Sequence, residues 1–174
     1  MPNAVTHFLI PAILVALFRD FYLRKRDKKD FPLHYVLIAG LAGIAVDLDY
    51  VIQFVTGSLG HRIFFHNLFF PLIFLILGLL FIGNRNKELG KHKLKLSTIF
   101  FVICFSAIVH LILDGLIIGN IYPLYPFLDF GIGLNLVGYL PEILQESIIP
   151  IIDAILLCLW MIWIEVRHKI SDFI

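Results

Sequence analysis

Charged residues and cysteines are both scarce in this sequence. Of its 174 residues only 16% are Asp, Glu, Lys or Arg, whereas 60% are hydrophobic and the mean hydropathy is +0.92. A water-soluble domain of this length needs far more polar surface, so the composition excludes that class and indicates one membrane-embedded domain, residues 1–174. The two cysteines, Cys104 and Cys158, lie inside apolar runs without a CxxC pair, which favours a packing role. No cleavable signal peptide is expected, because the basic residues follow the first apolar run instead of preceding it.

The long apolar runs predict an all-α bundle with about five transmembrane helices. A hydrocarbon core about 30 Å thick takes roughly 20 helical residues to cross. The expected spans cover residues 4–23, 33–55, 66–83, 96–119 and 143–166. Pro11 interrupts the first span, which a membrane helix tolerates when neighbouring helices satisfy the freed carbonyl. Gly40 and Gly43 predict a close approach of another helix to the second span.

Basic residues are confined to alternate connections between these spans. Thirteen of the fourteen Lys and Arg residues lie within residues 19–29, 85–95 and 167–169, and the exception is Arg62. No Lys or Arg occurs between Lys95 and Arg167. By the positive-inside rule the N-terminus is expected outside and the C-terminus in the cytoplasm of a prokaryotic-type plasma or inner membrane. The segment 120–141 is then an outer-face loop or re-entrant piece.

Histidines and acidic residues gather near the outer face on this topology. The inner halves of the spans are nearly free of such groups. The set comprises His7, Asp47, Asp49, His61, His66, His110, Asp114, Glu142, Glu146 and Asp153. An ionisable side chain in the hydrocarbon region is costly unless it is paired or binds a ligand, so this clustering predicts a functional site.

The fourth span holds the sharpest pair. His110 and Asp114 are four residues apart, so they stack on one helix face and can ligate one ion or two adjacent ions. The alternative is a His–Asp hydrogen bond with only a packing role. Ser106, one turn earlier, also permits a Ser–His–Asp reading, although a serine at that depth lacks a substrate path.

Two further groups precede the third span. Asp47 and Asp49 diverge on a regular helix, so either one binds metal while the other orients a ligand, or the helix unwinds there. They could instead be helix-end carboxylates solvated at the headgroups. His61 and His66 follow two glycines, as suits a turn that presents imidazoles to a site. Arg62 between them could bind an anion bidentately or pair with an aspartate.

On the fifth span, Glu142, Glu146 and Asp153 fall on one side of the helix axis, and an acidic stripe is expected to face the bundle. His and carboxylate donors without a thiolate suit Zn²⁺, with Mn²⁺ as second choice. Such metals ionise a bound water near neutral pH and polarise a phosphoryl or carbonyl oxygen.

The order of these motifs resembles the inner-membrane, metal-dependent hydrolase family (YdjM-like). That family has an early His, a P-D-x-D element, an H-R-G-x-T-H-S element and an H-x-x-x-D element followed by a Gly and a Tyr/Trp-Pro pair. The corresponding elements are His7, V-D-L-D ending at Asp49, H-R-I-F-F-H-N from His61, H-L-I-L-D from His110 and L-Y-P ending at Pro126. The resemblance covers residues 6–127. Departures at Val46, Ile63, Phe65 and Asn67 leave the metal-type residues intact but change expected substrate contacts.

A fainter similarity links the sequence to zinc-dependent phospholipase C and S1/P1-type nucleases. By that analogy the ligands of two or three zinc ions would be His7, Asp47, His61, His110 and Asp114. Glu142 and Glu146 would stand where that family has a second His and an acid. The resemblance implies hydrolysis of a phosphoester, plausibly of a lipid.

The main hypothesis is therefore a membrane-embedded, zinc-type hydrolase that acts on a lipid phosphoester at the outer leaflet. Its metal set is His7, Asp47, His61, His66, His110, Asp114 and Glu142. Asp49 or Glu146 would be the general base for a metal-activated water, and Arg62 would stabilise anionic charge. No nucleic acid is expected as a partner. The alternatives are an ion-coupled or metal transporter, which needs polar groups continuing to the inner face, and a scaffold stabilised by metal.

Overall fold

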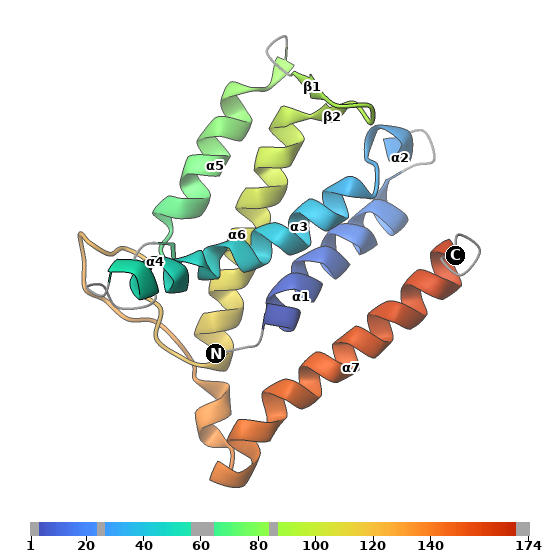
Figure 1. Ribbon diagram of the computed structural model, residues 1–174. Helices are drawn as coiled ribbons and strands as arrows, with labels where there is room; N and C mark the ends of the chain where they lie inside the picture. The colour runs from blue at the N-terminus through green and yellow to red at the C-terminus, as the bar shows by residue number, and fades with distance from the viewer. Residues whose placement is uncertain (1–3, 24–26, 57–64, 84–86, 170–174) are drawn as a thin grey trace.

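The computed structural model describes residues 4–23, 27–56, 65–83 and 87–169. This part of the chain is predominantly helical, with one two-stranded antiparallel ribbon (Figure 1). The principal elements are α1 (Ala4–Leu17), the π-helical turn η1 (Phe18–Tyr22), α2 (Asp27–Asp30), α3 (His34–Ala45), the 3₁₀ turn η2 (Val46–Leu48), α4 (Asp49–Thr56), α5 (Phe69–Leu80), β1 (Glu88–Leu89), β2 (Leu94–Lys95), α6 (Leu96–Ile117), the 3₁₀ turn η4 (Leu136–Tyr139) and α7 (Glu142–His168).

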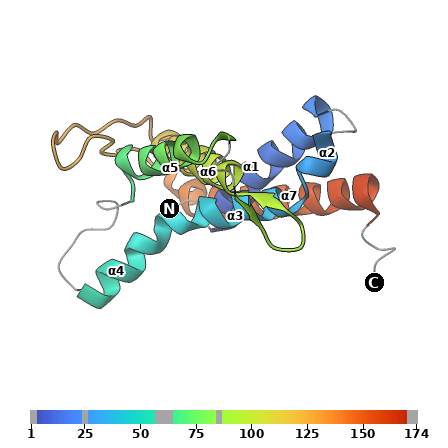
Figure 2. The ribbon, with the colours of Figure 1, turned by 90° about the horizontal axis from the view of Figure 1, so that it is seen from above.

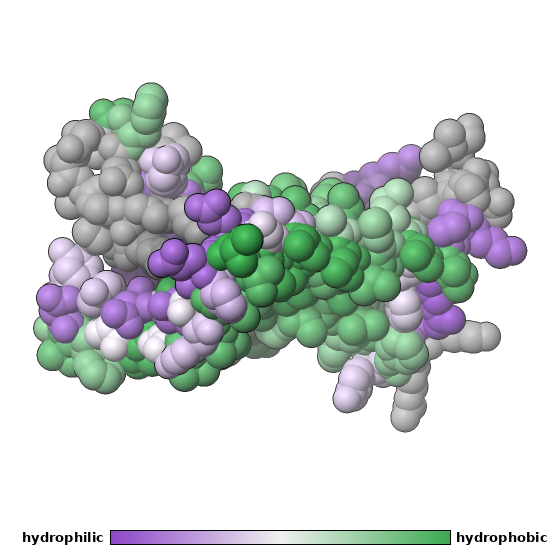
Figure 3. Space-filling view, turned by 90° about the horizontal axis from the view of Figure 1, so that it is seen from below, coloured by the Kyte–Doolittle hydropathy of each residue, from purple (hydrophilic) through white to green (hydrophobic). Residues whose placement is uncertain are grey.

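Helices α1, α3, α5 and α6 pack side by side, and α7 lies along one edge of this group (Figure 1). The apolar core sits between α1, α3 and α6 and consists of Ala12, Val15, Ala16, Tyr35, Val36, Ala39 and Val102. Seen from above, α4 continues beyond α3 and leaves the bundle (Figure 2). A wide apolar surface occupies the middle of the face in Figure 3, and most hydrophilic residues of that face lie toward its two ends. This distribution suits a molecule surrounded by lipid.

Three helical stretches in the described chain are long and apolar enough to cross a bilayer: Ala4–Tyr22, Leu96–Ile117 and Glu142–Arg167. The second and third expected spans correspond to shorter apolar helices, His34–Leu48 and Phe69–Leu80. At 12 residues, α5 is about 18 Å long, less than the hydrocarbon thickness. The helical, membrane-spanning class is therefore clear, whereas five complete crossings go beyond what helix length supports.

Small residues allow α1 and α3 to cross closely. A Cβ at Gly43 would overlap the backbone carbonyl of His7, and one at Gly40 would lie 2.6 Å from the ring of Phe8. The predicted close approach at these two glycines is confirmed. It brings the N-terminal turn of α1 beside the end of α3, and this crossing positions the site described below.

The segment between α6 and α7 is a packed loop. Ile121 and Ile132 exchange two backbone hydrogen bonds, and Leu134 donates one to the carbonyl of Gly115 in α6. Leu68, directly before α5, donates to the carbonyl of Pro123. The loop therefore joins the C-terminal end of α6 to the N-terminal end of α5.

Candidate metal centre

Four separate segments bring histidines and aspartates to one place inside the bundle. His7 comes from α1, Asp47 from η2, His66 from the turn before α5, and His110 and Asp114 from α6. His7, His66 and His110 are fully buried, and Asp114 is 1% exposed. These residues form two overlapping groups of metal-type donors, His7–His110–Asp114 and Asp47–His66–His110, each with ligand atoms within 4.8 Å of one another.

The hydrogen bonds at Nδ1 decide how the two central imidazoles are oriented. His110 Nδ1 lies 2.7 Å from the carbonyl oxygen of Gly43, and His66 Nδ1 lies 2.7 Å from Asp49 Oδ2. A carbonyl or carboxylate oxygen can only accept, so each Nδ1 carries the donating hydrogen. In the neutral rings each Nε2 is therefore left with a lone pair.

These two Nε2 atoms face each other at 3.2 Å. Neither neutral ring can donate a hydrogen bond to the other, so a cation between them would satisfy both lone pairs. Two ligand atoms held at about 2.0–2.1 Å from one zinc ion in tetrahedral geometry lie about 3.3 Å apart. The observed separation fits this value.

Carboxylate oxygens complete the surroundings of the Nε2 pair. His66 Nε2 lies 3.3 Å from Asp114 Oδ2 and 3.5 Å from Asp47 Oδ1, and His110 Nε2 lies 3.7 Å from the same Asp47 oxygen. Asp47 and Asp114 thus belong to different donor groups that share His110. Each group combines two imidazoles with one carboxylate, and donors of these kinds would suit Zn²⁺ or Mn²⁺.

Asp114 divides its two oxygens between neighbouring positions. Oδ2 faces His66, while Oδ1 lies 3.3 Å from His7 Nε2. The ring of His7 stacks on that of His110 with centroids 3.8 Å apart. Within the described residues neither ring nitrogen of His7 makes a hydrogen bond. Asp114 therefore presents one oxygen to His66 and the other to His7.

The local change from α-helix to 3₁₀ turn explains the different contacts of Asp47 and Asp49. The turn η2 interrupts the regular spacing between α3 and α4. Asp47 then faces His66 Nε2 and its side chain is 17% exposed, whereas Asp49 is buried against His66 Nδ1. Asp47 thus lies in one of the two donor groups, whereas Asp49 contacts the other ring nitrogen of His66.

Four further predicted site residues are not among the described members of these donor groups. His61 and Arg62 fall outside the described residues. Glu142 and Glu146 are exposed on the first turns of α7 and belong to neither donor group. Of the predicted acidic stripe on α7, only Asp153 is buried, and it accepts a hydrogen bond from Thr6 in α1. The buried acid of the fifth span, Asp153, therefore contacts Thr6, the residue before His7, and belongs to neither donor group.

The Ser–His–Asp reading has no support in this geometry. Ser106 is fully buried, and its hydroxyl makes no hydrogen bond within the described chain. Both nitrogens of His110 face other partners, Gly43 and His66. Sequence reasoning also missed the carbonyl of Gly43 and the hydroxyl of Thr6, because a backbone acceptor and a long-range threonine contact leave no spacing signal. Asn67 caps α5, since its side-chain oxygen accepts from the backbone N–H groups of Phe69 and Phe70.

Fold and site together define a helical membrane protein with a buried histidine–aspartate cluster at one end of its bundle. The model of the YdjM inner membrane protein family matches residues 1–170, so the chain belongs to this family and is an inner membrane protein. No curated protein and no solved structure matches the chain. The family description names a location and no reaction.

Proposed function

We propose that the protein is a membrane-embedded, metal-dependent hydrolase that cleaves a phosphoester of a lipid. The observation that carries this proposal is the facing Nε2 pair of His66 and His110, with both Nδ1 atoms engaged and carboxylate oxygens of Asp47 and Asp114 around them. A bound Zn²⁺ would supply a water ionised near neutral pH and would polarise the phosphoryl oxygen.

The chain's own residues have distinct roles in this proposal. Asp47, His66 and His110 would hold one ion, and His7, His110 and Asp114 form the group that would contribute to a second. His61, outside the described residues, remains the predicted further ligand for a third ion, whereas Glu142 is exposed at the start of α7 and belongs to neither donor group. Asp49 and the carbonyl of Gly43 fix the ring orientations of His66 and His110.

Proton transfer and anion binding are assigned to residues outside the two donor groups. Because Asp49 is occupied by His66 Nδ1, its contact favours orientation over proton transfer. Glu146 remains the predicted general base, and Arg62 the predicted group for anionic charge. The partial exposure of Asp47 marks the side from which a substrate and water would reach the donor groups.

A lipid substrate is supported by the surface beside the cluster. Tyr50 and Phe54 in α4 are 58% and 86% exposed, and Phe127 in the loop beside α5 is 77% exposed. Aromatic side chains of this kind suit the interface between hydrocarbon and headgroups. A phosphoester of a lipid in that layer would lie at the depth of the cluster.

The proposed topology places this site at the non-cytoplasmic face. The bent stretch α3–η2–α4, residues 34–56, is long enough to be one crossing, and α5 with its preceding turn would be a short one. Five crossings with the N-terminus outside then place the basic connections in the cytoplasm. His7 and Asp114 lie at the opposite ends of their helices from those connections.

The main alternative is an ion-coupled or metal transporter. Such a protein needs a polar route from the cluster to the other face. Between His7 and the far end of α1, the core consists instead of the apolar cluster around Ala12, Val15, Ala39 and Val102. This apolar core favours a site open to one membrane face over a continuous polar route across the bilayer. A metal-stabilised scaffold differs from both by having no turnover.

Metal analysis combined with a phosphoester screen tests the proposal. Purified protein is expected to contain zinc in at least equimolar amount, and it should hydrolyse a lipid phosphoester in a chelator-sensitive way. Metal-free folded protein would reject the metal centre, whereas metal-replete protein inactive on lipid and nucleotide phosphoesters would favour the scaffold. Glu146→Gln in protein with full metal content examines the base separately, because undiminished hydrolysis would remove Glu146 from that role.

A further inference from the structure

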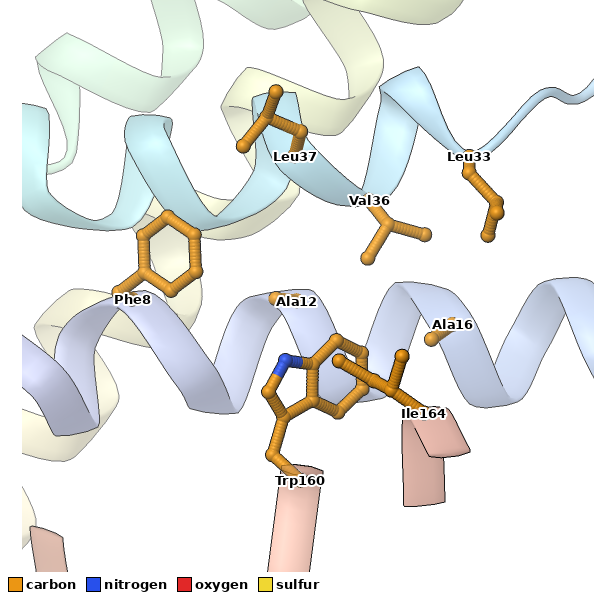
Figure 4. A pocket seen from close by; sticks show the side chains of 8 residues that line it. All are labelled: Phe8, Ala12, Ala16, Leu33, Val36, Leu37, Trp160 and Ile164. Atoms are coloured by element: carbon orange, nitrogen blue, oxygen red, sulfur yellow. The ribbon is translucent and has the colours of Figure 1, made fainter. Parts of the chain in front are cut away.

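Helix α7 contacts the bundle along a narrow seam and leaves apolar grooves beside it. Of the stretch of α7 that is long and apolar enough to cross a membrane, only 6% is buried within the described chain. One groove of about 230 Å³ lies between α1, α3 and α7, with Trp160 of α7 facing α1 (Figure 4). Its lining is formed by Phe8, Ala12, Ala16, Leu33, Val36, Leu37, Trp160 and Ile164. A second groove of about 240 Å³ lies on another side of Trp160, between Ile13 and Leu17 of α1 and Leu156 of α7.

Three cations surround one buried carboxylate at the end of these grooves. Asp20 Oδ1 lies 2.9 Å from Arg19 Nη1 and 4.0 Å from Lys28 Nζ, and Asp20 Oδ2 lies 3.7 Å from Arg167 Nε. The Asp20 side chain is 3% exposed, whereas Arg167 is half exposed. Among the described residues, these contacts place three cations, Arg19, Lys28 and Arg167 (the basic cluster), against the one carboxylate of Asp20, and the half-exposed Arg167 makes the cluster accessible from outside.

The basic cluster continues the first groove. Arg19 follows Ala16 by three residues on the α1–η1 helix, and Arg167 follows Ile164 by three residues on α7. Residues three apart are neighbours on a helix surface, about 4.5 Å along the axis. An apolar groove that ends at a cluster of cations complements a molecule with an acyl chain and an anionic headgroup.

We propose that an anionic phospholipid binds here, with its phosphate at the basic cluster and an acyl chain in the groove beside Trp160. The buried indole N–H of Trp163 lines the second groove and has no acceptor among the described residues, and a glycerol ester carbonyl would supply one. Arg19 lies 12 residues beyond His7, about 18 Å along the helix, so this lipid is separate from the substrate position at the candidate metal centre. The bound lipid completes the seam that holds α7 against α1 and α3.

Native mass spectrometry of the full chain in detergent tests this site with dioleoyl phosphatidylglycerol and dioleoyl phosphatidylcholine. Phosphatidylglycerol is expected to bind tightly as one retained molecule, and phosphatidylcholine more weakly. Lys28→Gln or Arg167→Gln alone should weaken phosphatidylglycerol binding about fivefold. The double variant should weaken it about 25-fold. The matched control Lys87→Gln with Lys91→Gln removes two exposed cations elsewhere and should leave the affinity within about twofold.

Equal binding of the two lipids, or equal losses in the paired and control variants, would show bulk lipid and overturn the proposal. Glycerol 1-phosphate without acyl chains forms a further arm. Binding of this soluble headgroup as tight as that of phosphatidylglycerol would assign the cluster to free phosphate and likewise reject the lipid. Both lipids are compared in each variant. The helical far-UV signal of each variant is also measured, so that a general loss of folding is distinguished from a loss of lipid binding.

Discussion

At the residue scale, His66 contacts three aspartates and one histidine of the candidate metal centre. Its Nδ1 contacts Asp49, and its Nε2 contacts Asp47, Asp114 and His110. A fully buried imidazole with three aspartates around it is costly without compensation. A divalent cation would neutralise part of this acidic charge and use the Nε2 lone pair. Metal binding and the stability of this end of the bundle are therefore expected to be coupled.

The donor residues are testable by metal content. His110→Ala and Asp114→Ala should each remove most of the bound metal, because each deletes a donor shared by the cluster. Metal is measured by elemental analysis of purified, folded protein. His92→Ala is the matched control, since His92 is exposed in the β1–β2 connection and should retain full occupancy. Full occupancy in a folded His110→Ala, Asp114→Ala double variant would exclude both residues as ligands.

The orienting role of Asp49 predicts a different result. Asp49→Asn keeps the side-chain shape but replaces the anionic acceptor at His66 Nδ1. Metal affinity should fall about 10- to 100-fold, with the stoichiometry recovered at high metal concentration. Competition with a chromophoric chelator measures this affinity. An unchanged affinity would contradict the orienting role, and a stoichiometry that never recovers would make Asp49 a direct ligand.

At the element scale, the crossing of α1 and α3 places His7 beside Gly43, which also contacts His110 of α6. Gly43 permits the crossing and also accepts the hydrogen bond from His110 Nδ1. The same close approach places Thr6 of α1 opposite Asp153 of α7. Three helices therefore meet at one turn of α1, and an error in their spacing would displace His7 from Asp114.

Gly43→Ala should accordingly lower both thermal stability and metal content. The new Cβ would overlap the carbonyl of His7, so α1 must move away from α3. The expected loss of unfolding free energy is about 1–3 kcal/mol, typical of overpacking. Gly115→Ala is the matched control in α6, because its Cβ would meet Ile121 at an ordinary 3.6 Å. Comparable melting temperatures and metal contents in the two variants would contradict the role of the α1–α3 crossing.

At the scale of the whole molecule, the two ends of the bundle have opposite chemistry. One end holds the histidine–aspartate cluster, and the other holds the basic cluster around Asp20, with an apolar core between them. The β1–β2 ribbon with its lysines lies toward the same end as α2, away from the loop that follows α6 (Figure 1). This polarity agrees with the distribution of basic residues along the chain.

Cysteine labelling tests the proposed orientation. In a variant without the two native cysteines, Glu88→Cys should react with an impermeant maleimide only after cell lysis, and Ile121→Cys should react in intact cells. The first position lies in the basic connection and the second in the loop after α6. Labelling of position 88 from outside would reverse the proposed topology.

Local features of the sequence predicted much of this organisation. The apolar runs indicated membrane helices, and the four-residue spacing of His110 and Asp114 placed both on one face of α6, because these signals depend only on neighbouring residues. The lengths of the second and third spans were less predictable. An apolar run does not reveal where a 3₁₀ turn interrupts a helix, or how soon a helix such as α5 ends.

Composition and local spacing were enough to specify the membrane environment, the helical class and the kinds of donor available to a metal. Long-range packing was needed to show that His66 faces His110 across 44 residues of sequence, that Asp47 and Asp49 contact opposite nitrogens of His66, and that Asp153 instead of Glu142 is buried. These contacts depend on how α1, α3, α6 and α7 cross. Crossings are determined by the packing of whole helix surfaces, which no local spacing encodes.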